Sequence, residues 1–240
     1  MKKELLFLSL SMILLLTPQF VLAQTKFEVH VGGAFPEGDF SRYNFDQAIF
    51  GNSGCAETGV DLGVKLFRPS SGNKNLYFTL SLDVINNALS KKFTDEIGSS
   101  MRASIENPNV KLSMTYPSYT NCPIMLGLSY NIPLDTRNDF YFDGGLGVNF
   151  ISVSDMTLTA KYNGLSASET VSTESSQAFA GQIGVGVLFE KKINLGINYN
   201  LLGSYELHGK DKASNDSETT IPSTGTMSER TLNIYLGYRF

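Results

Sequence analysis

The chain has 240 residues, of which 42% are hydrophobic and only 18% are charged, and its formal net charge is −4. A soluble domain usually contains about 25% charged residues. Two cysteines exclude a disulfide-dense scaffold, and the net negative charge disfavours a nucleic-acid-binding protein. A polytopic helical membrane protein is also excluded, because residues 5–16 form the only long apolar run and each spanning helix needs roughly 20 apolar residues.

The first element has the layout of a secretory signal peptide. Two lysines precede the apolar residues 5–16, and a small residue, Ala23, stands before Gln24. A membrane-anchoring helix is the alternative, but the apolar block is too short to span a bilayer. We therefore expect residues 1–23 to be a signal peptide and residues 24–240 to form one domain in an oxidising compartment.

Eight segments then alternate between apolar residues and small or polar residues, which is the period-two pattern of β-strands. In chain order they cover about residues 27–35, 59–66, 76–84, 124–132, 140–150, 179–189, 193–201 and 231–240. One face is bulky and apolar, and the other is rich in Gly, Ser, Asn and Asp. A soluble β-sandwich also alternates, but its core needs bulky inward faces. A Gly-rich polar face suits the cramped interior of a narrow barrel.

The connections between these segments alternate in length. Long connections cover about residues 36–56, 87–121, 153–177 and 204–229, and short ones cover about residues 68–75, 133–138 and 190–192. Long loops on one side and tight turns on the other are typical of outer-membrane barrels. Aromatic residues tend to end the apolar faces: Phe27, Phe140, Phe189, Tyr238 and Phe240 at the short-turn rim, and Phe35, Phe150 and Phe179 at the long-loop rim. We predict an all-β fold, an eight-stranded antiparallel up-and-down transmembrane β-barrel with four long extracellular loops and three short periplasmic turns.

The two ends of this predicted barrel carry further signals. The last segment ends in Tyr238-Arg239-Phe240, and the first runs into residues 31–40, VGGAFPEGDF. Together with the signal peptide and eight strands, they resemble the small eight-stranded outer-membrane β-barrel families of Gram-negative bacteria, in particular barrels from Bacteroidota. The resemblance implies that Tyr238 and Phe240 form the C-terminal signal for the barrel-assembly machinery. It also implies a monomer in outer-membrane lipid with extracellular loops, an OmpA-like barrel without a C-terminal peptidoglycan-binding domain.

Seven ionisable residues fall on the inward faces of the predicted strands. They are Glu28, His30, Asp61, Lys65, Asp83, Asp143 and Arg239. A lone buried charge is costly, whereas a paired and hydrogen-bonded charge is tolerable. Since side chains roughly fill the interior of an eight-stranded barrel, we expect a charged network that fills the lumen. A narrow polar path for ions or small solutes is the alternative.

The sequence offers little catalytic or metal-binding chemistry. Of the two histidines, His30 is predicted to lie inside the barrel, and His208 lies in the last long loop near Glu206 and Asp211. Acyl hydrolysis also needs a positioned nucleophile, and no particular serine is singled out. Two distant histidines and two distant cysteines match no metal-ligand spacing. We therefore predict no catalytic residues, no metal and no cofactor.

The long loops leave two questions open. Cys55 and Cys122 each stand just before a strand at the long-loop rim, so a Cys55–Cys122 disulfide and two free thiols both remain open, although their strands are not neighbours. The loops either carry binding function or form a solvated, poorly ordered cap. The expected function is display of surface loops, in a structural role or to bind an unidentified extracellular ligand. A narrow porin-like channel is the second hypothesis, and a lipid- or peptide-modifying hydrolase is the third.

Overall fold

The structure is a computed structural model of the 240-residue chain, and it describes residues 25–105, 107, 109–213, 218–222 and 225–240. Eight strands form a closed barrel with the neighbour order β1-β13-β10-β9-β6-β5-β3-β2. They are β1 (Lys26–Glu37), β2 (Gly59–Pro69), β3 (Leu76–Ala88), β5 (Ser118–Pro133), β6 (Asp139–Val153), β9 (Ser176–Phe189), β10 (Ile193–Tyr205) and β13 (Met227–Arg239). The predicted signal peptide lies outside the described residues.

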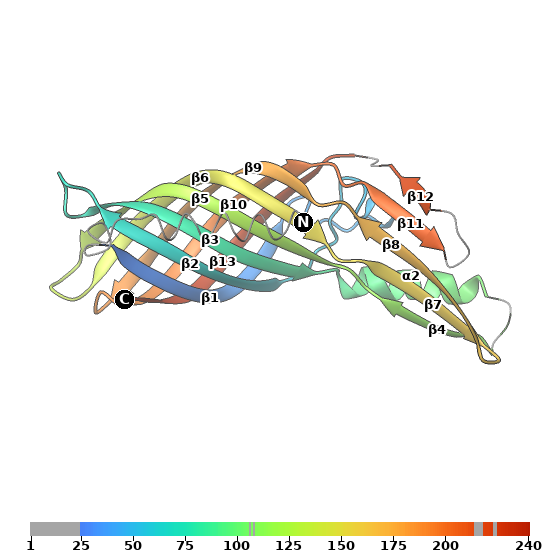
Figure 1. Cartoon of the computed structure of the whole chain (residues 1–240). Helices are drawn as coiled ribbons and strands as arrows, with labels where there is room; N and C mark the ends of the chain where they lie inside the picture. The colour runs from blue at the N-terminus through green and yellow to red at the C-terminus, as the bar shows by residue number, and fades with distance from the viewer. Residues whose placement is uncertain (1–24, 106, 108, 214–217, 223–224) are drawn as a thin grey trace.

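The barrel is an antiparallel meander whose first and last strands close it (Figure 1). The pairs β1–β2, β2–β3, β3–β5, β5–β6, β6–β9, β9–β10 and β10–β13 follow the chain and are all antiparallel. The predicted eight-stranded up-and-down barrel is therefore confirmed. Each of the eight alternating segments corresponds to one barrel strand, because a period-two pattern places its apolar side chains on one face of the wall.

The two faces of the wall differ in polarity as the alternation predicts. On the outward face, Val31 is 54% and Leu126 is 68% exposed, whereas the inward-facing Asp61 is 1% exposed. Aromatic rings gather on the outward face at the short-turn end, where the Phe27 and Tyr238 ring centroids lie 6.1 and 4.9 Å from that of Phe240. The outside of the barrel is thus an apolar belt, and the inside is polar.

A second sheet and a helix project from the long-loop end of the barrel (Figure 1). The sheet has the order β12-β11-β8-β7-β4. Its strands are β4 (Lys111–Thr115), β7 (Met156–Tyr162), β8 (Leu165–Thr173), β11 (Gly209–Ala213) and β12 (Glu218–Ile221), and the helix is α2 (Lys91–Ala103). No helix in the described ranges is long and apolar enough to cross a membrane. Of the two alternatives left open for the long loops, a solvated and poorly ordered covering is wrong for these segments, because they form regular structure.

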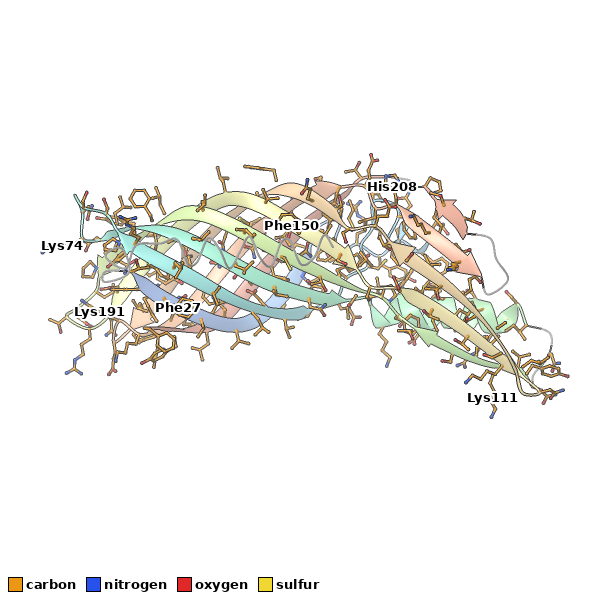
Figure 2. All side chains as sticks on the ribbon, in the orientation of Figure 1. Phe27, Lys74, Lys111, Phe150, Lys191 and His208 are labelled. Atoms are coloured by element: carbon orange, nitrogen blue, oxygen red, sulfur yellow. The ribbon has the colours of Figure 1, made fainter. Side chains whose placement is uncertain are left out.

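We call the first long connection, residues 38–58 between β1 and β2, the cap. It contains a short 3-10 helix, η2 (Phe45–Gln47), and it lies over the long-loop end of the barrel. Figure 2 places Lys74 and Lys191 at the opposite, short-turn end and Lys111 at the far tip of the projecting sheet. The molecule therefore has three parts along its length: a barrel, a cap and a projecting module of sheet and helix.

Candidate functional site

The barrel lumen contains all seven ionisable residues predicted to point inward, and all seven are buried. At the short-turn end, Arg239 on β13 meets Glu28 on β1. The Arg239 Nη2 atom lies 2.8 Å from Glu28 Oε2, and Nε donates to the same oxygen at 3.0 Å. Asn194 Nδ2 donates to Glu28 Oε1 at 2.9 Å. The Arg239 guanidinium also stacks 3.7 Å from the centre of the Phe67 ring, so this pair is both hydrogen-bonded and packed.

A second ion pair crosses the lumen. Lys65 Nζ on β2 donates to Asp143 Oδ2 on β6, and both side chains are at least 95% buried. Around the wall, β2 and β6 are three strands apart. The hydroxyls of Tyr141 and Tyr235 meet at 2.9 Å across a similar span, from β6 to β13. These contacts place side chains in the middle of the lumen rather than along its wall.

A glycine makes room for the tyrosine pair. A Cβ atom at Gly196 would lie 2.3 Å from Tyr235 Cζ and 2.5 Å from Tyr141 Oη. The small residues of the inward face therefore leave space that long side chains from other strands fill, which is the physical reason for the glycine-rich alternation.

The third lumen group combines the remaining predicted residues. His30 Nε2 lies 2.9 Å from Asp83 Oδ1 and 3.9 Å from Asp61 Oδ2. Asn233 Nδ2 donates to Asp61 Oδ2 at 2.8 Å, and the Tyr235 ring lies 4.7 Å from the His30 ring between centroids. Sequence reasoning assigned no metal ligands, yet these three side chains have the donor types and the spacing of a metal site. The alternation of side chains along each strand predicts that all three residues point into the lumen. Their positions along the barrel axis, however, depend on the register between the strands.

An apolar cluster lies where the cap meets the long-loop end of the barrel. Its buried members are Phe40, Ile49, Cys55, Ala56, Leu89, Phe93, Tyr119, Ile151, Val153, Tyr205, Leu207 and Met227. Phe40 of the cap packs edge-on against Tyr119 of β5 with 5.1 Å between ring centroids, and the Tyr119 hydroxyl donates to the Gly54 carbonyl at 2.8 Å. The first long loop is thus folded into the mouth rather than solvated.

The two cysteines are free and lie on opposite sides of the barrel wall. Cys55 is buried in the apolar cluster of the cap. Cys122 has the same strand parity as Ile124, whose side chain is on the outward, exposed face of β5. A Cys55–Cys122 disulfide is therefore absent, because the wall separates the two thiols.

His208 lies near the junction of the barrel and the projecting sheet (Figure 2). Its side chain is exposed, and its backbone carbonyl accepts a hydrogen bond from the Glu174 N–H at 2.9 Å. Asp211 instead lies near Glu169 on the neighbouring strand β8, and this carboxylate raises the pKa of Glu169 above its ordinary value. The backbone contact of His208 joins the end of β8 to the segment that leads into β11.

Helix α2 is anchored to the cap. Ser90 caps its N-terminus by accepting a hydrogen bond from the Phe93 N–H at 3.2 Å, which satisfies one free donor of the first turn. The Phe93 ring is buried 5.5 Å from that of Phe45. The Tyr43 hydroxyl donates to Glu96, and the Lys92 ammonium lies 3.9 Å above the Tyr43 ring. The cap therefore fixes the helix to the barrel.

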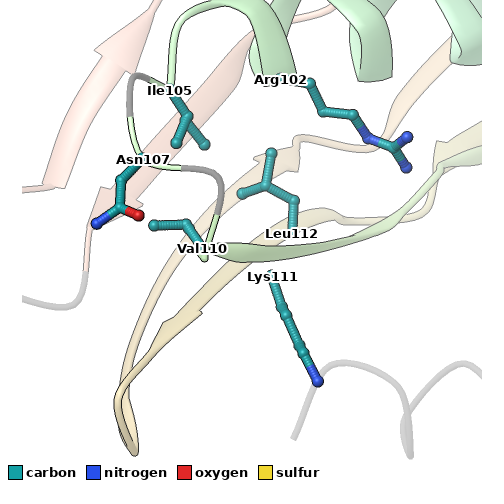
Figure 3. Close-up of a pocket in the computed structure, with 6 residues that line it drawn as sticks. All are labelled: Arg102, Ile105, Asn107, Val110, Lys111 and Leu112. Carbon is teal, nitrogen blue, oxygen red and sulfur yellow. The ribbon is translucent and has the colours of Figure 1, made fainter.

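The projecting module has two exposed features. At the tip, the β7–β8 hairpin turns through Asn163 and Gly164, whose positive φ angles of 48° and 83° fit a tight hairpin turn. Leu165 beside this turn is 75% exposed. At the end of α2, a hollow of about 480 Å³ is lined by Arg102, Ile105, Asn107, Val110, Lys111 and Leu112 (Figure 3). Both features are on the part of the molecule farthest from the barrel.

The family model for the outer membrane protein beta-barrel domain matches residues 7–240. No curated protein matches the chain. Among solved structures, Neisserial surface protein A is similar at 10% identity and a TM-score of 0.46, covering 90% of this chain and 96% of that one. A major outer membrane protein from Thermus thermophilus has 15% identity and a TM-score of 0.47, covering 90% and 99%. OprG from Pseudomonas aeruginosa has 14% identity and a TM-score of 0.42, covering 90% and 95%.

Proposed function

The chain belongs to the outer membrane protein β-barrel domain family, and from this premise we propose that it is a closed, non-catalytic barrel that holds a folded binding module outside the cell. The barrel supplies the anchor in the outer membrane. The projecting sheet and α2 supply the surface that meets an extracellular ligand. Residues 1–23 act as the export signal.

The observation that carries this proposal is the double closure of the barrel. Inside the wall, the Arg239–Glu28 and Lys65–Asp143 pairs occupy the lumen. At the mouth, the cap packs Phe40 against Tyr119. A pore needs neither a folded cap nor cross-lumen pairs, whereas a rigid anchor benefits from both. Binding sites are commonly placed on loops that a rigid scaffold positions.

The two ends of the barrel support the proposed orientation. The chain enters β1 and leaves β13 at the short-turn end, where the Phe240 N–H donates to the Phe27 carbonyl at 2.7 Å. Barrels of this class keep short turns in the periplasm and long loops outside. The projecting module therefore faces the exterior.

Planar-bilayer recording with the purified full chain tests the closed state. We expect no discrete conductance steps from the native protein, and discrete steps would support the narrow channel instead. A matched pair of epitope insertions tests the orientation. An epitope between Asn163 and Gly164 should be detected by antibody on intact cells, whereas the same epitope in the turn at residues 134–138 should be detected only after permeabilisation. The reverse result would contradict the proposed orientation.

A further inference from the structure

Three lumen side chains are not explained by the ion pairs that close the barrel. His30, Asp61 and Asp83 come from the adjacent strands β1, β2 and β3, and each offers one ligand atom such that all three atoms lie within 4.8 Å of one another. Their side chains are 3%, 2% and 9% exposed at most. The permanent cations of the lumen, Lys65 and Arg239, are bound to other carboxylates.

The register of the sheet builds this cluster around one glycine. Gly63 on β2 pairs with His30 on β1 and with Asp83 on β3, so the three residues form one row across the wall. A Cβ atom at Gly63 would lie 2.0 Å from Asp83 Oδ1 and 2.4 Å from His30 Nε2. The missing side chain lets His30 and Asp83 meet although a whole strand separates them. Asp61 stands two residues away from Gly63 on the same inward face.

The spacing of the ligand atoms suits a small tetrahedral ion. Metal bonds of about 2.1 Å to imidazole nitrogen and carboxylate oxygen place two ligands of a tetrahedron about 3.4 Å apart. His30 Nε2 lies 2.9 Å from Asp83 Oδ1 and 3.9 Å from Asp61 Oδ2, on either side of that value. The three ligand atoms all lie within 4.8 Å of one another, so a shared ion requires the side chains to move by about an ångström rather than the strands to shift.

The polar atoms of the cluster are incompletely satisfied. Within the described part of the chain, Asp61 Oδ1 has no hydrogen-bond partner, and neither ring nitrogen of His30 meets the geometry of a hydrogen bond despite the short distance to Asp83. A buried carboxylate oxygen without a donor is costly. Asn233 already satisfies the other oxygen of Asp61, so the unpartnered atoms point to a cation rather than to a further protein donor.

The charge balance of the lumen leads to the same conclusion. The buried acids are Glu28, Asp61, Asp83, Asp139, Asp143 and Glu229, and the buried bases are Lys65 and Arg239 together with the imidazole of His30. Among the described residues, six carboxyl groups thus face three basic groups, even when His30 is protonated. A buried carboxylate is tolerated only where a cation or hydrogen-bond donors compensate its charge, and a bound divalent cation would compensate Asp61 and Asp83.

We propose that His30, Asp61 and Asp83 bind a divalent first-row transition-metal ion inside the barrel. One imidazole and two carboxylates suit such ions, including Zn²⁺. The ion ties β1, β2 and β3 together through their side chains. Because the three side chains are buried in the lumen, the ion is bound while the barrel folds, and its binding free energy contributes to folding.

The test is refolding of the full chain in detergent with Zn²⁺, followed by removal of free metal and elemental analysis. Native protein should retain about one zinc per chain. His30→Gln and Asp83→Asn should each retain less than about one tenth of that. Glu229→Gln is the matched control, because it removes a buried carboxylate eight residues along β13 from Gly237, the register partner of His30. This control should retain the full amount.

A second measurement uses Co²⁺, whose visible absorption reports a tetrahedral site. The native protein and Glu229→Gln should give the tetrahedral spectrum, and His30→Gln should not. Heat-modifiable gel migration shows whether each variant has folded. Folded native protein without bound metal, or metal retained by folded His30→Gln, would overturn the proposal. If both cluster variants fail to fold, the metal content of the native protein alone decides.

Discussion

Lys65 and Asp143 form a buried ion pair across the barrel lumen, although their strands β2 and β6 are three strands apart around the wall. The pair is therefore a brace between distant parts of the barrel as well as a filler of its interior. Removing one partner of a buried pair leaves an uncompensated charge, which is much worse than removing both.

Lys65→Met should destabilise the barrel by about 3–5 kcal/mol, because Asp143 is left buried and unpaired. The double variant Lys65→Met, Asp143→Asn should recover at least about 1 kcal/mol of this loss, since the two sites are coupled. Urea unfolding in lipid vesicles, followed by tyrosine fluorescence, measures both values. A single variant as stable as the native protein would mean that the pair contributes nothing.

Gly196→Ala should destabilise the barrel by roughly 1–3 kcal/mol through overpacking. The added Cβ would lie 2.3 Å from Tyr235 Cζ, and Tyr235 is held in place by its hydroxyl contact with Tyr141. Gly181→Ala is the control, because the nearest atoms to its new Cβ would be at 3.5 and 3.8 Å. The same unfolding measurement should show Gly181→Ala close to the native value, and equal losses for the two variants would contradict the explanation.

Phe40→Ala should loosen the cap. The Phe40 side chain is fully buried against Tyr119, and deleting a buried phenylalanine side chain costs about 3–5 kcal/mol. Cleavage by trypsin after Arg42, which lies in the cap, should become much faster in the otherwise folded protein. Phe142→Ala removes an outward-facing ring of the barrel wall and should leave this cleavage rate unchanged. Equal rates for the native protein and Phe40→Ala would show that Phe40 does not hold the cap.

The projecting sheet should lose stability as the pH rises through the pKa of Glu169. The Asp211 carboxylate raises the pKa of Glu169 in the folded protein. A carboxyl with a raised folded pKa gives its full contribution below the unfolded pKa, and this contribution is lost as the pH rises through the folded value. Hydrogen exchange of β8 and β11 between about pH 4 and pH 7 measures the change. The effect should be at most a few tenths of a kcal/mol because Glu169 is mostly exposed.

Two glutamine variants check the sign of this effect. Glu169→Gln removes the repulsion and should flatten the pH dependence. Glu174→Gln should instead lower the stability of the sheet slightly at neutral pH, because it removes the exposed ion pair of Glu174 Oε1 with Lys210 Nζ at 3.3 Å. An unchanged pH dependence in Glu169→Gln would exclude the Glu169–Asp211 contact as its source.

The barrel could be predicted from the sequence because each strand shows its inward and outward faces through parity. The pairing of the charges could not be predicted, because the alternation shows that Lys65 points inward but not where along the barrel axis it meets Asp143. That position depends on register across several strands. The alternation also predicts the fate of the cysteines. Cys122 shares the outward face of its strand with Ile124, which separates it from Cys55 in the cap.

The projecting module was missed for a different reason. The strand β8 has the sequence LSASETVST, which lacks a bulky apolar face, and most of its residues are exposed. The strands β4 (KLSMT) and β7 (MTLTAKY) do alternate, but they have only five and seven residues, and β4 carries only two apolar side chains. Helix α2 buries only Phe93. These elements are stabilised by continuity with the barrel strands and by the cap, and neither cause is visible in a local window of sequence.

The apolar cluster beneath the cap joins the beginning of the chain to its end. Phe40 follows β1, whereas Met227 begins β13, the strand that completes the cylinder. The full cluster can assemble only after the final strand has arrived. The cap therefore packs over the mouth at the same late stage of folding at which β13 pairs with β1 and closes the barrel. The packing that covers the mouth therefore depends on the same strand that completes the cylinder, so a barrel without β13 would lack both.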